Sequence, residues 1–194
     1  MPNWIVGITN RKGGVGKTTL SCALAVQCAR ARLKTLLLDM DSDQADAIDW
    51  LTDGQLPEEE LESGTVYSTQ WERLDVCWIT DPRTELPPVD VYDCVVVDGR
   101  PSGAVSGYIL GACDLVLVPY IDEAGRKHGE KLASKTKHGA ILIPNIAAGR
   151  PLPGRRAVVY DQALEDHRWE LARMDLLYIV ESVLEEQRRP PEEA

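Results

Sequence analysis

The sequence predicts an α/β fold in which a mostly parallel β-sheet is flanked by helices on both faces. Six short apolar runs recur along the 194 residues, and most of them are continuously apolar, as strands covered on both faces should be. Helical patterns lie between several of these runs, and such alternation of strands and helices is typical of parallel sheets.

The expected elements follow one another along the chain. The strands, in order, are residues 4–9, 35–40, 76–80, 94–99, 115–120 and 140–144. The helices are about 17–31, 45–51, 103–113 and 123–137, with a long final helix over 160–187. The acidic residues 53–64, the proline-rich residues 80–90 and the basic residues 147–156 are expected as loops. Residues 1–187 are therefore expected to form one domain, and 188–194 a flexible tail.

The composition excludes several classes of protein. Apolar residues make up 44% and charged residues 27%, an ordinary globular balance. No apolar run is long enough to span a bilayer, and the first ten residues do not resemble a signal peptide. The five cysteines form no CxxC pair, which favours buried reduced thiols over metal ligands or disulfides. We therefore expect a cytoplasmic protein.

Positive charge is concentrated in one part of this acidic chain. Residues 125–156 carry a net charge of +7, which leaves −17 on the remainder of a chain whose net charge is −10. Such asymmetry can create a local positive field, although an ordinary solvated face is the alternative. Lys127, Lys131 and Lys135 are spaced four residues apart and would share one face of a helix. The candidate DNA-binding residues are these three lysines with Arg150, Arg155 and Arg156.

A glycine-rich stretch, "NRKGGVGKTT", lies between the first expected strand and the first expected helix. Glycines allow backbone N–H groups to converge on phosphate oxygens, and the start of the helix adds a positive dipole end. In such a loop Lys17 would reach the β- and γ-phosphates, and the Thr18 hydroxyl would bind Mg²⁺. The general phosphate-loop pattern requires glycine where this chain has Arg11.

The stretch instead resembles the deviant pattern K-G-G-x-G-K-[ST] of the ParA/MinD ATPases, which are P-loop NTPases. The matching residues are Lys12, Gly13, Gly14, Val15, Gly16, Lys17 and Thr18, and Thr19 extends the match. The resemblance implies that these residues bind ATP with Mg²⁺ and that the protein is an ATPase that forms a homodimer with ATP. It also implies that Lys12 reaches the phosphates of the partner's nucleotide, and that Lys12 and Lys17 are catalytic.

Carboxylates follow two of the expected strands. Asp39 and Asp41 end the second strand and Asp98 ends the fourth. Ligands of parallel α/β sheets collect at the carboxyl ends of the strands, where carboxylates can hold Mg²⁺ waters or orient an attacking water. By resemblance to the family, Asp41 positions the attacking water, while Asp39 and Asp98 support the metal through its bound water molecules. Asn145 is the candidate for the adenine side, although Pro144 interrupts its run.

The chain departs from the family in two places. It reads Asp41-Ser42-Asp43-Gln44 where the family usually has D-x-D-P-Q, so the proline is missing. Beyond about residue 146 it looks shortened, because a typical family member has another strand before the last helix.

A further resemblance lies after the fourth expected strand. "DGRPS", residues 98–102, resembles the family's D-x-x-P-S switch segment, so Gly99 to Ser102 are candidates for sensing the γ-phosphate.

The resemblance favours a small partition ATPase of the ParA type. Such a protein would bind DNA non-specifically as an ATP-bound dimer, associate with the nucleoid and respond to a centromere-binding partner of the ParB or ParG kind. One alternative is a MinD-like membrane-associated regulator, but the acidic final helix suits an anionic membrane poorly, and no stable membrane association is expected. Others are a small-molecule or metal-chaperone ATPase of the same superfamily and a carboxysome-positioning relative.

Overall fold

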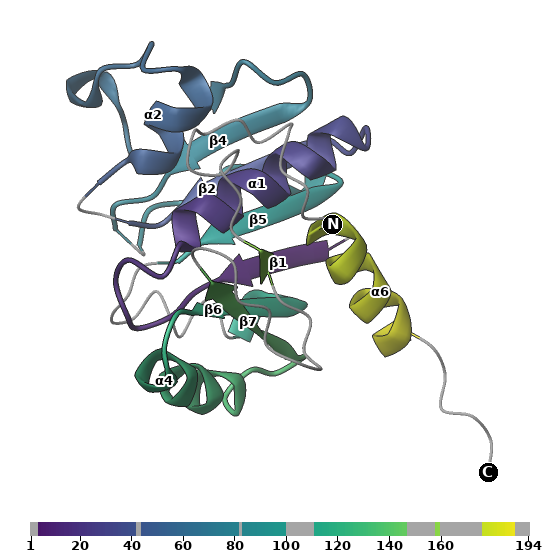
Figure 1. Cartoon of the computed structure of the whole chain (residues 1–194). Coiled ribbons are helices and arrows are strands. Elements are labelled where there is room, and N and C mark those ends of the chain that lie inside the picture. The colour runs from purple at the N-terminus through teal and green to yellow at the C-terminus, as the bar shows by residue number, and fades with distance from the viewer. Residues whose placement is uncertain are drawn as a thin grey trace.

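The computed structural model describes residues 4–41, 44–81, 83–99, 111–146, 158–159 and 176–188. They form an eight-stranded sheet in the order β3-β4-β2-β5-β1-β6-β7-β8 (Figure 1). The strands are β1 (Trp4–Ile8), β2 (Thr35–Asp39), β3 (Val66–Ser68), β4 (Leu74–Trp78), β5 (Cys94–Asp98), β6 (Leu115–Tyr120), β7 (Ala140–Ile146) and β8 (Val158–Val159). The strand pairs are parallel except β3 with β4, which is antiparallel. The predicted α/β class is confirmed.

Helices lie on both faces of the sheet. They are α1 (Lys17–Arg30), α2 (Asp46–Thr52), α4 (Glu123–Ala133) and α6 (Leu176–Arg188), with short 3-10 turns at Glu58–Glu60 and Val89–Val91. In Figure 1, α1 crosses one face of the sheet with α2 and α6 beside it, while α4 packs against β6 and β7.

The core has two layers because successive side chains of a strand point to opposite faces of a sheet. Leu37 and Val96 belong to the cluster that includes α1, whereas Leu36 and Val95 belong to the cluster on the other face. Both β2 and β5 are buried along their whole length, which explains why their sequences are continuously apolar. All five cysteines are buried free thiols.

Several predicted boundaries are wrong. β4 begins at Leu74 rather than residue 76, and α4 ends at Ala133 rather than residue 137. β7 continues through Pro144 to Ile146, so the proline does not end this strand. Proline is accommodated at this position although it lacks an N–H group.

Two strands were not predicted. β3 has three residues, and β8 has two, so neither is long enough to show a periodic pattern. β8 follows β7, contrary to the expectation that the chain goes almost directly into its last helix. Of the helix predicted over 103–113, only 111–113 are described; 111 and 112 are helical, and Cys113 lies just past the helix. Of the helix predicted over 160–187, the described part is α6, which includes Arg188, the first residue of the predicted tail.

Candidate functional site

The glycine-rich loop joins β1 to α1 and is open on its outer side. Gly14 and Gly16 have φ values of 68° and 82°, in the left-handed region that favours glycine. A Cβ atom added to Gly13 or Gly14 would meet no heavy atom within 4 Å. Gly16 is the N-cap of α1 and offers no side chain to its first turn. The loop and the start of α1 therefore present backbone N–H groups to an anionic ligand.

The start of α1 is linked to the end of β5. Lys17 is the first residue of α1 and is only 9% exposed. The Ser21 hydroxyl lies 3.0 Å from both the Lys17 carbonyl oxygen and Asp98 Oδ1. The Thr18 side chain lies close enough to Asp98 to act against the rise in its pKa. Lys17, Thr18 and Asp98 are thus brought together, with Ser21 as a link that sequence reasoning missed.

Two carboxylates lie side by side at the ends of neighbouring strands. Asp39 of β2 and Asp98 of β5 are register partners, and both are almost fully buried. Burial and the charge of Asp98 raise the pKa of Asp39. Burial raises the pKa of Asp98 to about 6, although hydrogen bonds from Thr18 and Ser21 and the charge of Lys17 act in the opposite direction. Such a pair of oxygen ligands with raised pKa values suits a divalent cation such as Mg²⁺.

Asp39 also organises the segment that follows it. Its Oδ1 accepts the Asp41 N–H at 3.0 Å, and its Oδ2 accepts the Ala47 N–H at 3.2 Å. The Trp78 indole donates to the Asp41 carbonyl oxygen at 2.7 Å, so the backbone of Asp41 is held from two sides. Asp41 is half-buried. Its negative charge lies close enough to Asp39 and Asp98 to help raise the pKa values of both. Ser42 and Asp43 lie outside the described residues.

Lys12 lies on the opposite side of the glycines from Lys17. Its side chain is 35% exposed, and its ammonium forms an ion pair with Asp122 at the start of α4. Its backbone N–H donates to Asn10 Oδ1 at 3.3 Å. Asn10 and Asp122 are further residues that sequence reasoning missed; the only sequence signal for Asp122 is that aspartate favours the N-cap position of a helix.

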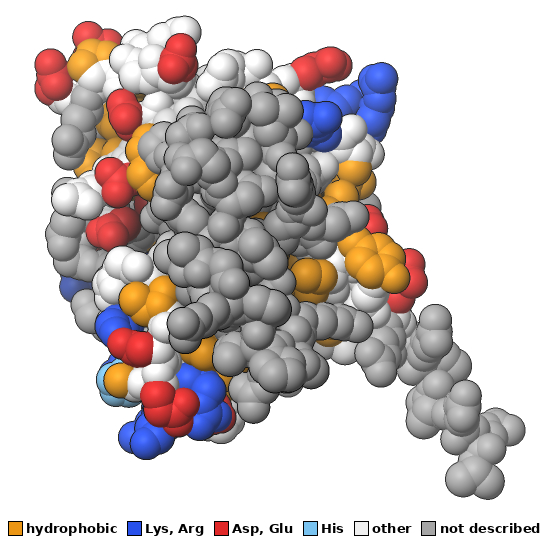
Figure 2. Space-filling model, viewed as in Figure 1, with side chains coloured by type: hydrophobic (Ala, Val, Ile, Leu, Met, Phe, Trp, Pro, Cys, Tyr) orange, Lys and Arg blue, Asp and Glu red, His pale blue; other side chains and the backbone are white. Residues whose placement is uncertain are grey.

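The predicted basic surface is only partly present among the described residues. Lys127 and Lys131 are exposed on α4, whereas Lys135 is exposed just beyond the end of that helix, so the three lysines do not lie on one helix as predicted. Their role in DNA binding stays a prediction. Arg126 forms ion pairs with Glu123 and Glu130, and these two glutamates offset most of the positive charge on α4. Figure 2 shows acidic and basic side chains intermixed over this helix. The other candidates, Arg150, Arg155 and Arg156, lie outside the described residues.

Asn145 lies near the end of β7, where it pairs in register with Val158 of β8. Its position in the sheet is two strands away from β1, on the side of β6. The role predicted for it on the adenine side stays a prediction. Of the switch segment, Gly99 donates its N–H to the Ile8 carbonyl oxygen at 2.9 Å, and residues 100–102 lie outside the described residues.

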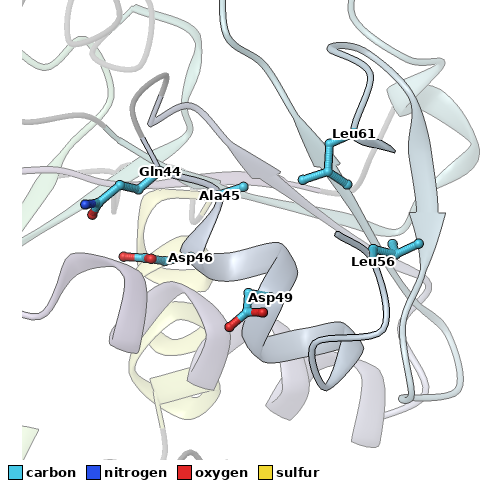
Figure 3. A pocket seen from close by; sticks show the side chains of 6 residues that line it. All are labelled: Gln44, Ala45, Asp46, Asp49, Leu56 and Leu61. Atoms are coloured by element: carbon cyan, nitrogen blue, oxygen red, sulfur yellow. The ribbon is translucent and has the colours of Figure 1, made fainter. Parts of the chain in front are cut away.

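A pocket of about 310 Å³ lies beside the segment that follows Asp41. Its lining combines acidic side chains of α2 with two leucines that precede β3, as Figure 3 shows. The lining residues are Gln44, Ala45, Asp46, Asp49, Leu56 and Leu61. None of the predicted nucleotide-binding residues is among them, so this pocket is not the expected phosphate site.

Fold and site together define a nucleotide-binding domain with a phosphate loop. A family model described as the CobQ/CobB/MinD/ParA nucleotide binding domain matches residues 6–188, and the chain belongs to this family. Among curated proteins, a chromosome partitioning protein ParA of Myxococcus xanthus is 57% identical over 37 residues. That match covers 19% of this chain and 13% of the relative.

Solved structures share the fold over much greater lengths. A plasmid partition protein of Borrelia burgdorferi B31, bound to AMPPNP, has a TM-score of 0.64 and 19% identity, covering 96% of this chain and 98% of the other. MinD of Pyrococcus horikoshii, complexed with Mg-ADP, has a TM-score of 0.56 and 19% identity, covering 84% and 76%. The likeness to the Borrelia protein thus spans nearly all of both chains, whereas about a quarter of the MinD chain has no counterpart here.

Proposed function

We propose that this protein is an ATP-dependent partition ATPase of the ParA type. In this proposal it dimerises on binding ATP, holds DNA without sequence preference on the nucleoid, and releases it when a centromere-binding partner of the ParB or ParG kind stimulates hydrolysis. The observation that carries the proposal is the phosphate loop with its two lysines. Lys17 is nearly buried at the start of α1, whereas Lys12 is partly exposed on the other side of the open glycines.

The residues around the loop have complementary roles in hydrolysis. Lys17 and the N–H groups of the loop bind the β- and γ-phosphates, and Asp41 orients the water that attacks the γ-phosphorus. The bond between that phosphorus and the β–γ bridging oxygen breaks, which yields ADP and inorganic phosphate. Mg²⁺, held by Thr18 and through water by Asp39 and Asp98, would neutralise phosphate charge when bound.

Lys12 provides the link between hydrolysis and dimerisation. Phosphoryl transfer spreads negative charge over the phosphate oxygens, and a second cation at that position stabilises the transition state. Supplied by the partner subunit, Lys12 would make hydrolysis depend on the dimer. Its 35% exposure supports this role, because its side chain is accessible from outside the subunit.

The final helix supports a partition protein over a membrane-associated relative. Leu176, Val180 and Leu184 are buried in the core cluster that contains α1, and the Leu177 N–H donates to Gln27 of α1 at 3.0 Å. The apolar face of α6 is therefore covered by the protein's own core, which includes α1. Within the described part of the chain, no helix has the length and apolar character needed to cross a bilayer.

The proposal is tested by DNA binding. With ATP and Mg²⁺, the wild-type protein should bind duplexes of unrelated sequence about equally, because phosphates carry no sequence information. About three phosphate contacts per subunit would give the dimer a log–log salt slope near −5. Fluorescence anisotropy with ATP, with ADP and without nucleotide, across a salt series, measures both properties.

Charge-reversal variants locate the DNA surface. Lys127, Lys131 and Lys135 changed together to Glu should remove DNA binding while sparing ATP binding, and Arg150, Arg155 and Arg156 form a second set to test separately. Arg83→Glu is the matched control, because Arg83 is exposed on the loop between β4 and β5. Absence of DNA binding by the wild type with ATP at low salt would reject the partition proposal. Binding to anionic vesicles would then favour a MinD-like protein. If the protein bound neither DNA nor vesicles, a small-molecule or metal-chaperone ATPase would be favoured.

A further inference from the structure

Lys12 is held inside its own subunit by a residue far away in the sequence. Its ammonium pairs with the Asp122 carboxylate, 110 residues further along the chain, where β6 leads into α4. The two side chains are 35% and 47% exposed, so the pair lies at the surface rather than in the core. Surface ion pairs of this kind are weak and can exchange partners.

Asp122 uses its two carboxylate oxygens for different purposes. Oδ1 accepts the Gly125 N–H at 2.7 Å, which caps the start of α4, while Oδ2 contacts Lys12. The cap fixes the carboxylate relative to α4, so its second oxygen stays directed at the lysine. The hydrogen bond from Lys12 and then the Gly125 N–H lower the pKa of Asp122, which keeps it ionised. A Cβ on Gly125 would lie 3.7 Å from Lys12 Cδ, so the lysine side chain passes close to the first turn of α4.

The backbone of Lys12 is tied to the same corner of the fold. Asn10 Oδ1 accepts the Lys12 N–H at 3.3 Å, and Asn10 Nδ2 donates to the Pro119 carbonyl oxygen at 2.7 Å and to the Gly125 carbonyl oxygen at 3.4 Å. Asn10 is fully buried, so these contacts form part of the protein interior. The phosphate loop and the β6–α4 corner therefore hold Lys12 by backbone and side chain together.

We propose that Asp122 is a positioning residue that retains Lys12 within its own subunit until the phosphates of a partner's nucleotide replace the Asp122 carboxylate. This inference rests on the proposed role of Lys12 in the partner's site. One ammonium cannot serve both positions at once, so forming the dimer requires that each subunit give up its Lys12–Asp122 pair. Asp122 thereby sets the concentration at which the ATP-bound protein dimerises.

The expected size of the effect follows from the exposure of the pair. A surface ion pair shifts an equilibrium by at most about fivefold. Because the symmetric dimer breaks two of them, the dimerisation constant should change by at most about 25-fold. A multivalent phosphate group outcompetes a single carboxylate for an ammonium. The Lys12–Asp122 pair therefore breaks when two nucleotide-bound subunits meet.

Asp122→Asn tests the inference, since asparagine is a good N-cap but carries no charge. Sedimentation velocity with ATP and Mg²⁺, over a range of protein concentrations, gives the midpoint of dimerisation. Performing it in the Asp41→Ala background slows turnover during the measurement. We expect Asp122→Asn to lower the midpoint several-fold and to lower the monomer's thermal midpoint by no more than a few degrees, the loss of one surface ion pair. Glu123→Gln is the matched control, because its carboxylate is exposed beside Asp122 but pairs with Arg126.

The Lys12→Ala background separates positioning from a general structural effect. Without the ammonium, adding Asp122→Asn should produce no gain in dimerisation; a gain there would overturn the inference. An unchanged or raised midpoint for Asp122→Asn in the presence of Lys12, with dimerisation of the parent protein intact, would reject the role of Asp122 alone. If the parent protein and the wild type both stay monomeric with ATP, the proposed function fails, and this inference with it.

Discussion

Asp98→Asn should stabilise the nucleotide-free protein at neutral pH even though Asp98 belongs to the candidate site. Asp98 is 2% exposed and is the register partner of Asp39. Its burial raises its pKa from the ordinary 3.8 to about 6. Asparagine has the same shape and can still accept from Ser21, but it carries no charge that must be kept in the interior.

The sign and size of the change in the free energy of unfolding follow from the linkage between folding and proton binding. Because the folded-state pKa is raised, the folded protein binds more protons than the unfolded chain between pH 3.8 and about 6. The free energy of unfolding therefore falls as the pH rises through this window, and the decrease is complete above about pH 6. A rise from 3.8 to about 6 corresponds to about 3 kcal/mol. Of this cost, about 2 kcal/mol develops between pH 4 and pH 7.

The measurement is urea unfolding of both proteins at a series of pH values, with EDTA and without nucleotide. The advantage of Asp98→Asn over the wild type should grow by about 2 kcal/mol from pH 4 to pH 7. Asp53→Asn, at an exposed position, is the control and should follow the wild-type curve. The variant should also lose the Mg²⁺-dependent part of its stabilisation by ATP. Parallel pH curves for wild type and Asp98→Asn would refute the reasoning.

Three further predictions concern the loop, the Asp41 carboxylate that is proposed to orient water, and the final helix. Lys17→Ala should abolish ATP binding in calorimetry, whereas Lys12→Ala should bind ATP and lose hydrolysis; turnover of Lys12→Ala at the wild-type rate would contradict the trans-lysine role. Asp41→Ala should bind ATP and accumulate as a persistent dimer in light scattering, because water is no longer oriented, and a variant that stays monomeric would make Asp41 structural. Val180→Asp should lower the free energy of unfolding by about 3 kcal/mol or more, since it places a charge in the core between α6 and α1; a loss below 1 kcal/mol in urea unfolding would show that α6 contributes little.

The sequence predicted most of the fold where its patterns are long or its motifs continuous. β2, β5 and β6 are buried throughout, so their apolar runs are visible without any knowledge of neighbours. The loop from Lys12 to Thr18 is contiguous in sequence, and its family is correctly predicted from it. β3 and β8 were missed because two or three residues paired at the edges of a sheet have no periodicity to detect.

The sequence by itself determined the order of the longer strands and helices, the family and the glycine-rich loop, because each depends on residues that are neighbours along the chain. Only the tertiary structure decided which distant groups meet. The pairing of β2 with β5 places Asp39 beside Asp98, and the pairing of β1 with β6 brings the loop to the corner where Asp122 contacts Lys12. Burial at the first contact raises carboxylate pKa values, whereas exposure at the second leaves a weak and exchangeable pair. Both effects depend on the distance between side chains and on their access to water, which are fixed only when the strands pair and the helices pack on the sheet.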